Sequence, residues 1–266
     1  MSRSCVAHHV GAGLIRGGSL SYHEDPELPG YWLYDGLRIQ ADVEAHQFAV
    51  GFAQRTLSPR TVVLDIAAGE GALAKQLLDR DFSVVCTSWN DRVQLDAPRF
   101  SVNLDYPFDA RDVGHRRYPL VCAIEIIEHV ENPAEFLRSC ERVLAPGGRV
   151  ILSTPNVENA AARLQWLWRG HPRIFSDEQV QQNRHISMPW GCGLEYLIDR
   201  AGLRVEEKHL VGRPRFAHNG WLAAAKRALY ASMAAVLPGD AHGTTRLYVL
   251  SRSADGRRAS GPSEVF

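Results

Sequence analysis

The sequence lacks three things: an excess of charge of either sign, a paired-cysteine pattern, and a long apolar run. Lysine plus arginine number 30 in the 266 residues, and so do aspartate plus glutamate. Global charge therefore gives no argument for a nucleic-acid or membrane-surface partner. The five cysteines are odd in number and form no C-x-x-C pair, which argues against a disulfide framework and a thiolate zinc site. We expect reduced, buried thiols and a cytoplasmic protein.

The apolar residues form no segment that we expect to span a membrane. The N-terminus has no continuous apolar stretch of the signal-peptide type. The one candidate for membrane contact is residues 221–237, which Lys226 and Arg227 interrupt and Pro238 ends short of a spanning length. An amphipathic helix that covers the core is our preferred interpretation of this segment. An interfacial helix in peripheral contact with a membrane is the alternative.

The chain does contain a regular alternation of short apolar runs with helical patterns. Strands are expected at residues 61–66, 83–87, 120–124, 149–153, 204–211 and 245–251. Helices are expected at residues 39–57, 72–80, 134–144, 157–168, 194–201 and 221–237. Such alternation predicts parallel strands joined by right-handed helical crossovers, which is the doubly wound α/β class.

Composition divides the chain into a domain with flanking segments. Residues 1–38 are rich in glycine, histidine, proline and serine, and we expect a loosely structured N-terminal segment. Residues 39–253 form the domain. Within it, residues 157–192 read as a helical insert or lid, because residues 170–190 are too long and too aperiodic for an ordinary connector. Residues 254–266 are polar and are expected to be a disordered tail.

A glycine-bearing turn follows the first of the expected strands. Asp65 ends this strand, and Ala67, Gly69 and Gly71 precede the next helix. Glycine lets a ligand approach the main chain, and a helix N-terminus presents unpaired N–H groups. Ligands of doubly wound sheets bind beyond the carboxyl ends of the strands, so we expect a nucleotide-type ligand here, with a plain tight turn as the alternative. A dinucleotide fingerprint fails at two of its three glycine positions, which disfavours an NAD-linked oxidoreductase.

Residues 63–71, VLDIAAGEG, resemble the first motif of class I S-adenosylmethionine-dependent methyltransferases. The resemblance implies a seven-stranded, mostly parallel, Rossmann-like sheet whose glycine loop wraps the amino-acid part of the cofactor, with Asp65 helping to fix its ammonium group. The sequence departs from the family at two positions. Ala67 replaces the usual glycine, and Ser88 replaces the acid that usually binds the ribose hydroxyls. Alanine at position 67 is tolerable if its φ is negative and costly if its φ is positive.

A second stretch resembles the same family. Residues 122–133, CAIEIIEHVENP, are similar to the E-x-x-E-H-x-x-x-P signature of many small-molecule methyltransferases. The pattern is most similar to O-methyltransferases of ubiquinone biosynthesis and to methyltransferases of cell-surface polysaccharide pathways. The resemblance implies that Leu104 and Asp105 flank the adenine, and that Ile124 belongs to the cofactor site.

The glutamates and histidines of this signature are candidates for catalysis and for metal binding. Glu125, His129 and His185 are the candidate catalytic residues, because a hydroxyl acceptor that is not already acidic needs a base. Small-RNA 2′-O-methyltransferases and some ubiquinone-pathway enzymes hold a divalent ion with an E-x-x-E-H motif and a downstream histidine. By this resemblance Glu125, Glu128, His129 and His185 would bind Mg²⁺ or a softer divalent ion. The alternative is that Glu128 and His129 only cap or pack the following helix.

Four aromatic residues of the insert could contact the acceptor. Trp166, Trp168, Phe175 and Trp190 are suited to stacking on a sugar or an aromatic ring. Packing within the core of the insert is the alternative.

The sequence therefore predicts a methyltransferase that uses S-adenosylmethionine to methylate a hydroxyl group, rather than an amine, of a small molecule or glycan. Two alternatives stay open. Ala67 and Ser88 suggest a catalytically degenerate protein of the same fold that acts as a binding or scaffold partner. The glutamates and the histidine of the signature suggest a metal-dependent RNA 2′-O-methyltransferase, although the neutral net charge and the lack of a basic stripe argue against nucleic acid.

Overall fold

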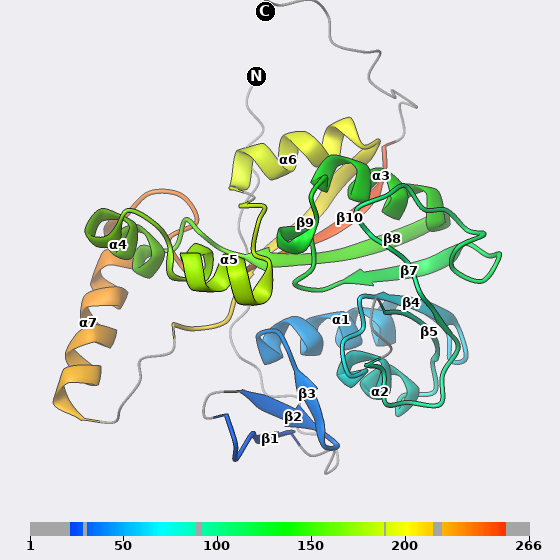
Figure 1. The fold of residues 1–266 in the computed structure, drawn as a ribbon, viewed down its shortest axis with the longest axis horizontal. Coiled ribbons are helices and arrows are strands. Elements are labelled where there is room, and N and C mark those ends of the chain that lie inside the picture. Colours follow the sequence, from blue (N-terminus) through cyan, green and yellow to red (C-terminus); the bar gives the residue numbers. More distant parts are fainter. Residues whose placement is uncertain (1–21, 29–30, 89–91, 189, 215–219, 254–266) are drawn as a thin grey trace, which may run out of the picture.

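The computed structural model describes residues 22–28, 31–88, 92–188, 190–214 and 220–253. Its centre is a seven-stranded sheet in the order β6-β5-β4-β7-β8-β10-β9 (Figure 1). The strands are β4 (Val62–Ile66), β5 (Ser83–Thr87), β6 (Arg99–Phe100), β7 (Tyr118–Ala123), β8 (Leu144–Pro155), β9 (Leu203–Val211) and β10 (Thr245–Arg252). Only β10 pairs antiparallel with its neighbours in this sheet, so the predicted doubly wound, mostly parallel sheet is confirmed.

Helices cover both faces of the sheet. Successive residues of a strand point to opposite faces, so neighbouring apolar residues of one strand pack against different helices. On one face, Val63 of β4 joins a buried cluster with α1 (Val43–Thr56) and α2 (Ala72–Leu78). On the other face, its neighbour Leu64 joins a cluster with α3 (Pro133–Val143) and α6 (Gly191–Arg200). Figure 1 shows the two pairs of helices on opposite sides of the strands. The core is therefore two layers of apolar side chains separated by the sheet.

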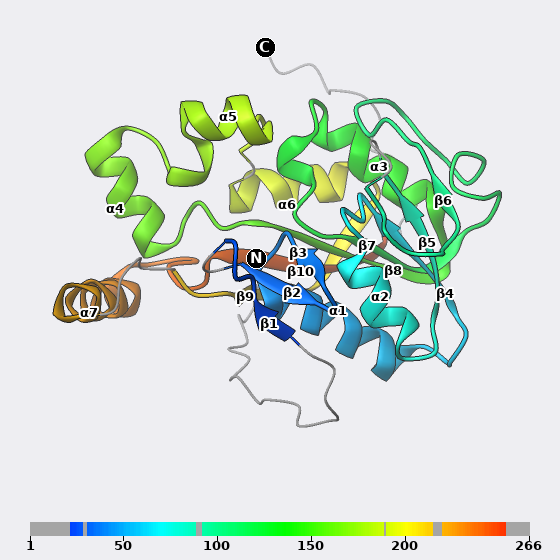
Figure 2. The ribbon, with the colours of Figure 1, turned by 60° about the horizontal axis from the view of Figure 1, so that its bottom comes forward.

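The N-terminal segment is more ordered than its composition suggests. Its described residues form an antiparallel sheet of β1 (Tyr22–Glu24), β2 (Trp32–Tyr34) and β3 (Leu37–Ile39), which lies beside α1 and α2 (Figure 2). The expectation of a loosely structured segment up to residue 36 is wrong for these residues. Asp35 and Gly36 join β2 to β3 and both have positive φ, as the tight turn of a hairpin requires. The helix expected from residue 39 begins only at Val43 because β3 occupies the preceding positions.

The insert between β8 and β9 contains α4 (Ala160–Arg169) and α5 (Asp177–Asn183), and α7 (Trp221–Val236) follows β9. Asn159 caps α4 by accepting a hydrogen bond from the N–H of Ala162. Gly170 ends the helix with a φ of 77°. Helix α7 contacts α4 at one end of the molecule (Figure 1). The predicted tail of residues 254–266 lies outside the described residues.

The cysteines of the described residues are free thiols. Cys86, Cys122 and Cys140 are buried, and burial raises the pKa of each thiol. Cys192 is exposed, and Cys5 lies outside the described residues. The buried thiols behave as small apolar side chains.

Candidate functional site

A cavity of about 340 Å³ opens at the carboxyl ends of β4 and β7. The strand order reverses between these two strands, since β5 and β6 lie on one side and β8 on the other. Such a reversal leaves a crevice that ligands of doubly wound folds occupy. The cavity is lined by seven of the residues that the sequence nominates, namely Asp65, Ala67, Gly69, Ser88, Ile124, Glu125 and His129.

The turn between β4 and α2 bends through several left-handed residues. Ala67 has a φ of 57°, Gly69 of 58° and Gly71 of 99°. Thr87 at the end of β5 holds the turn: its Oγ1 accepts the N–H of Ala67 at 3.0 Å and its carbonyl accepts the N–H of Ala68 at 3.0 Å. The alanine at position 67 therefore sits in the conformation where a Cβ is costly, which is the unfavourable one of the two cases anticipated from the sequence.

Replacing Ala67 with glycine is expected to leave the protein as stable as the wild type or slightly more stable. Relief of the left-handed strain, about 1 kcal/mol, offsets the extra flexibility of glycine in the unfolded chain. Ala68→Gly is the matched control, because Ala68 does not have a positive φ and should lose about 0.4–1 kcal/mol. Thermal unfolding of both variants tests this, and an equal loss in both would show that position 67 is unstrained.

Asp65 lies beneath this turn and is buried, and its Oδ2 has no hydrogen-bond partner. Burial raises the pKa of its carboxyl group to about 7. A buried carboxyl oxygen without a partner is costly, and such an atom at a cavity wall is suited to a cationic group of a ligand. Beside the glycine turn there is therefore one carboxyl oxygen that can accept a hydrogen bond from a cationic group of a ligand.

The N-terminal sheet supplies part of the cavity wall, which the sequence analysis missed. Arg38 of β3 lines the cavity, as do Gln40 and Ala41 in the connection that follows it and His46 of α1. The main-chain N–H of Arg38 donates to Glu70 in the glycine turn at 2.8 Å. The signal that could have revealed this sheet is the Asp35-Gly36 pair between apolar residues, a strong indicator of a hairpin.

The remaining predicted cofactor residues differ in their position relative to the cavity. Leu104, Asp105 and Gly71 are not among the described residues that line the cavity. The Asp105 carboxylate accepts the N–H of Glu131 at 2.9 Å and lies 3.5 Å from the guanidinium of Arg184. The adenine-flanking role of Leu104 and Asp105 stays a prediction. Ser88 is buried at the end of β5 and borders the cavity, and its contact with the ribose stays a prediction.

Glu125 follows β7 in a left-handed conformation, with a φ of 48°, and faces the cavity. Ser153 of β8 donates its hydroxyl to Glu125 Oε1 at 2.8 Å, and its Oγ accepts the N–H of Glu125 at 3.0 Å. Burial, followed by the nearby Glu128 and Asp42, raises the pKa of Glu125 well above its usual range. The raised pKa favours the protonated form of Glu125 over the carboxylate.

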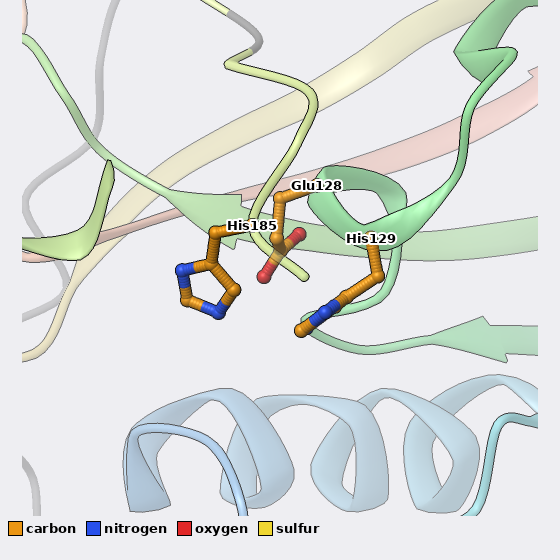
Figure 3. A group of neighbouring side chains, drawn as sticks. All are labelled: Glu128, His129 and His185. Carbon is orange, nitrogen blue, oxygen red and sulfur yellow. The ribbon is translucent and has the colours of Figure 1, made fainter. Parts of the chain in front are cut away.

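Glu128, His129 and His185 converge, with one potential ligand atom from each lying within 4.8 Å of the others (Figure 3). Glu128 and His129 come from the 3₁₀ turn Ile127–His129, and His185 follows α5. The main chain ties the two segments together, because the carbonyl of Glu128 accepts the N–H groups of Ile186 and Ser187, both at 3.0 Å. The structure thus unites three of the four predicted metal ligands. Among the described residues, Glu125 is not part of this group.

Hydrogen bonds fix the orientation of both imidazole rings. His129 Nδ1 lies 2.6 Å from the carbonyl oxygen of Asn183, and His185 Nδ1 lies 2.6 Å from that of Ile174. A carbonyl oxygen can only accept, so each Nδ1 carries the hydrogen and each Nε2 keeps a free lone pair. Burial lowers the pKa of His129 to about 4 and also lowers that of His185. Both rings are therefore neutral at neutral pH, the form that accepts a proton or binds a metal.

The four predicted aromatic residues do not form one cluster. Trp166 and Trp190 line a second cavity, of about 460 Å³, together with Met188. Phe175 packs against the ring of His185, with 5.7 Å between the ring centroids. Trp168 is exposed. Of these four residues, Phe175 is therefore the one in ring contact with the histidine pair.

A family model that describes a methyltransferase domain matches residues 39–208 of the chain. The ubiquinone biosynthesis O-methyltransferase of Serratia proteamaculans (strain 568) is 27% identical over 158 residues, which cover 56% of this chain and 64% of that protein. The enzyme of the same name from Pseudomonas aeruginosa (strain LESB58) is 32% identical over 102 residues, which cover 35% of this chain and 44% of that protein. The chain thus spans less than two thirds of the length of these relatives.

Solved structures of methyltransferases share the fold at low sequence identity. A methyltransferase from Streptomyces caelestis superposes with a TM-score of 0.53 and 14% identity, covering 80% of this chain and 91% of that one. Magnesium protoporphyrin IX methyltransferase from Synechocystis PCC 6803, solved with bound SAH, gives a TM-score of 0.52 and 11% identity, covering 79% of this chain and 83% of that one. At this identity the likeness concerns the fold alone.

Proposed function

Since the chain belongs to the class I S-adenosylmethionine-dependent methyltransferases, we propose that it transfers a methyl group to a hydroxyl of a small molecule or glycan. When bound, S-adenosylmethionine supplies a methyl group activated by a sulfonium centre. The preference for a hydroxyl draws support from the curated relatives, whose names specify O-methyl transfer. A cytoplasmic location, in keeping with the free thiols, is part of the same proposal.

The observation that carries the cofactor assignment is the buried Asp65. Asp65 lines the cavity and its buried Oδ2 has no hydrogen-bond partner, so the carboxylate would take the ammonium group of the cofactor. The residues present therefore fit S-adenosylmethionine at this end of the cavity. Ser88, with one hydroxyl, offers the ribose less than a carboxylate would.

On the acceptor side, His129 is the residue best placed to take up a proton. It lines the cavity, its Nε2 has a free lone pair, and it is neutral at neutral pH, although a pKa lowered to about 4 also makes it a weaker base than an exposed imidazole. We assign it as general base for an acceptor hydroxyl, with His185 beside it at a centroid separation of 4.7 Å. Glu125, which Ser153 holds and whose raised pKa favours the protonated form, would donate a hydrogen bond to the acceptor.

Calorimetric titration of the purified protein with S-adenosylmethionine and with its demethylated product tests the cofactor assignment. We expect micromolar binding of at least one of the two. Absence of binding up to millimolar concentration, in protein shown to be folded by circular dichroism, would favour a degenerate binding protein instead. Methyl transfer to candidate hydroxyl compounds then tests the acceptor class.

A second candidate function is favoured by the histidine group, which we propose binds a divalent metal ion. Glu128 is buried and accepts the Thr154 hydroxyl at 3.1 Å through Oε2. Two imidazoles whose Nδ1–H groups are held by carbonyls, with one carboxylate, form a donor set found in metal sites. Imidazole ligands suit Zn²⁺ better than Mn²⁺ or Mg²⁺. When bound, such an ion would lower the pKa of an acceptor hydroxyl.

Zinc binding to the unliganded protein, measured by competition with a chromophoric chelator, is expected to be stoichiometric and to weaken about 100-fold or more in His185→Gln. His171→Gln is the matched control, because His171 lies outside the group. Burial raises the pKa of Glu128, so zinc must displace its proton and the affinity should rise with pH through the neutral range. Failure of the wild type to retain any of the three metals, with activity unchanged in chelator, would leave the histidines as base and packing residues only.

A further inference from the structure

Helix α7 presents an apolar stripe to solvent. Trp221 and Val236 are 82% and 80% exposed, and Leu229 between them is also exposed. Their spacing of i, i+8 and i+15 places them on one side of the helix. The helix packs through Met233 and Ala234, which lie elsewhere on its circumference. The stripe is therefore not the face that the fold uses for packing.

Helix α4, which contacts α7, has a similar exposed face. Leu167 and Trp168 are 82% and 87% exposed, and Leu164 joins them at the i, i+3, i+4 spacing of a single face. Figure 1 places both helices at the same end of the molecule, and Figure 2 views α7 end-on beside α4. Large apolar side chains exposed together on neighbouring elements mark an interaction surface.

The charges of the two helices are all of one sign. Their basic residues are Arg163, Arg169, Lys226 and Arg227, and neither helix contains aspartate or glutamate. The nearest acids along the chain, Glu158 and Asp240, both pair with the buried Arg246. In a chain of zero net charge, this end of the molecule combines apolar and cationic groups.

The combination of apolar and cationic groups distinguishes between two possible binding partners of this surface, a second copy of the chain and an anionic membrane. A second copy of the chain would bring the same patch against itself across a two-fold axis, so cations would meet cations with no acid from either helix to pair with them. An anionic bilayer offers both an apolar layer for tryptophan and leucine and phosphate groups for lysine and arginine. The helices in the described part of the chain are all too short or too polar to cross a bilayer.

We propose that α4 and α7 form a docking surface for membranes that contain anionic phospholipids. The inference is independent of methyl transfer, because it rests on the exposure and charge of these two helices alone. It also has a geometric consequence. The insert that contains α4 also supplies Asn183 and Arg184 to the wall of the cavity, so docking would place the membrane next to the segment that borders the site.

Co-sedimentation of the full chain with vesicles tests the proposal. The vesicles are phosphatidylcholine alone or phosphatidylcholine mixed with phosphatidylglycerol. We expect binding to the mixed vesicles that weakens as salt is added, and little binding to phosphatidylcholine. Trp168→Ser combined with Trp221→Ser should reduce binding about ten-fold or more, since both side chains would lose their apolar contact. Lys226→Gln should weaken binding to mixed vesicles by about five-fold.

Tyr196→Ser is the matched control, because Tyr196 is an exposed aromatic residue on α6, away from the two helices. It should bind mixed vesicles as the wild type does. Circular dichroism and S-adenosylmethionine binding verify that each variant is folded. The proposal is overturned if the wild type does not bind mixed vesicles, or if the tryptophan variant binds them unchanged. It is equally overturned if the wild type is a dimer that the tryptophan variant dissociates while vesicles stay unbound.

Discussion

Asp65→Asn is expected to weaken the binding of S-adenosylmethionine about 30-fold or more, because it removes the buried carboxylate that we assign to the cofactor ammonium group. Asparagine has nearly the same shape, so the turn and the cavity should keep their form. Titration calorimetry at pH 8 measures the loss. Asp199→Asn, which changes an exposed acid on α6, is the control and should bind as the wild type does.

The same substitution is expected to stabilise the unliganded protein at high pH. Burial raises the pKa of Asp65 from 3.8 to about 7, so between pH 4 and pH 7 the folded state holds a proton that the unfolded state has released. The stability of the wild type therefore falls as the pH rises through this window, by up to about 4 kcal/mol at one pKa unit per 1.36 kcal/mol. Asparagine cannot ionise and does not lose this stability.

The measurement is the difference in free energy of unfolding between Asp65→Asn and the wild type from pH 4 to pH 8. The lowered pKa values of His46, His129 and His185 act in the opposite direction, but they contribute to both proteins and cancel in the difference. We expect the difference to grow with pH in favour of the variant and to level off above pH 7. A difference that does not change with pH would mean that Asp65 is ionised and already paired in the free protein.

Gly71→Ala is expected to destabilise the protein by about 3 kcal/mol. Gly71 precedes α2 with a φ of 99°, where an L side chain costs about 1–2 kcal/mol. An added Cβ would also lie 2.8 Å from Leu95 Cδ1. Leu95 packs against Tyr34, Leu37 and Ile39 of the N-terminal sheet, so its displacement would disturb that contact and add an overpacking cost of about 1–3 kcal/mol.

Gly170→Ala separates the two contributions. Gly170 has a similar positive φ, 77°, but nothing lies within 4 Å of an added Cβ. It should lose about 1–2 kcal/mol, the backbone strain alone. Urea unfolding of both variants provides the comparison. Equal losses would show that Leu95 moves aside freely and that the N-terminal sheet does not press on the glycine turn.

Local patterns in the sequence were sufficient for six of the seven strands of the central sheet and for the glycine turn at its edge, whereas the two-residue strand β6 (Arg99–Phe100) was missed. Short β-branched runs specify strands whatever surrounds them, and the glycines after Asp65 mark the turn into α2. These features depend on residues that are adjacent in the sequence, so the sequence alone is sufficient to predict them.

Other features of the site depend on segments that lie far apart in the sequence. The positive φ of Ala67 is held by Thr87, and the orientation of His185 is set by the carbonyl of Ile174. From the sequence, the proximity of His185 to Glu128 rested only on the resemblance to a family. The structure shows that the main chains of the two segments are hydrogen-bonded to each other. The N-terminal sheet borders the cavity because it packs on α2. The composition of its residues gave little indication of this packing.

Helix α7 shows most clearly the difference between what the sequence reveals and what the tertiary structure reveals. Its sequence determined that it is a short helix with apolar residues, two cations and no acid. Because amphipathicity shows that a helix has an apolar face but not what covers it, the preferred prediction was a helix packed on the core. Only the tertiary structure decided that the strands and α4 leave the stripe from Trp221 to Val236 uncovered, since burial is a property of the neighbours that a segment meets.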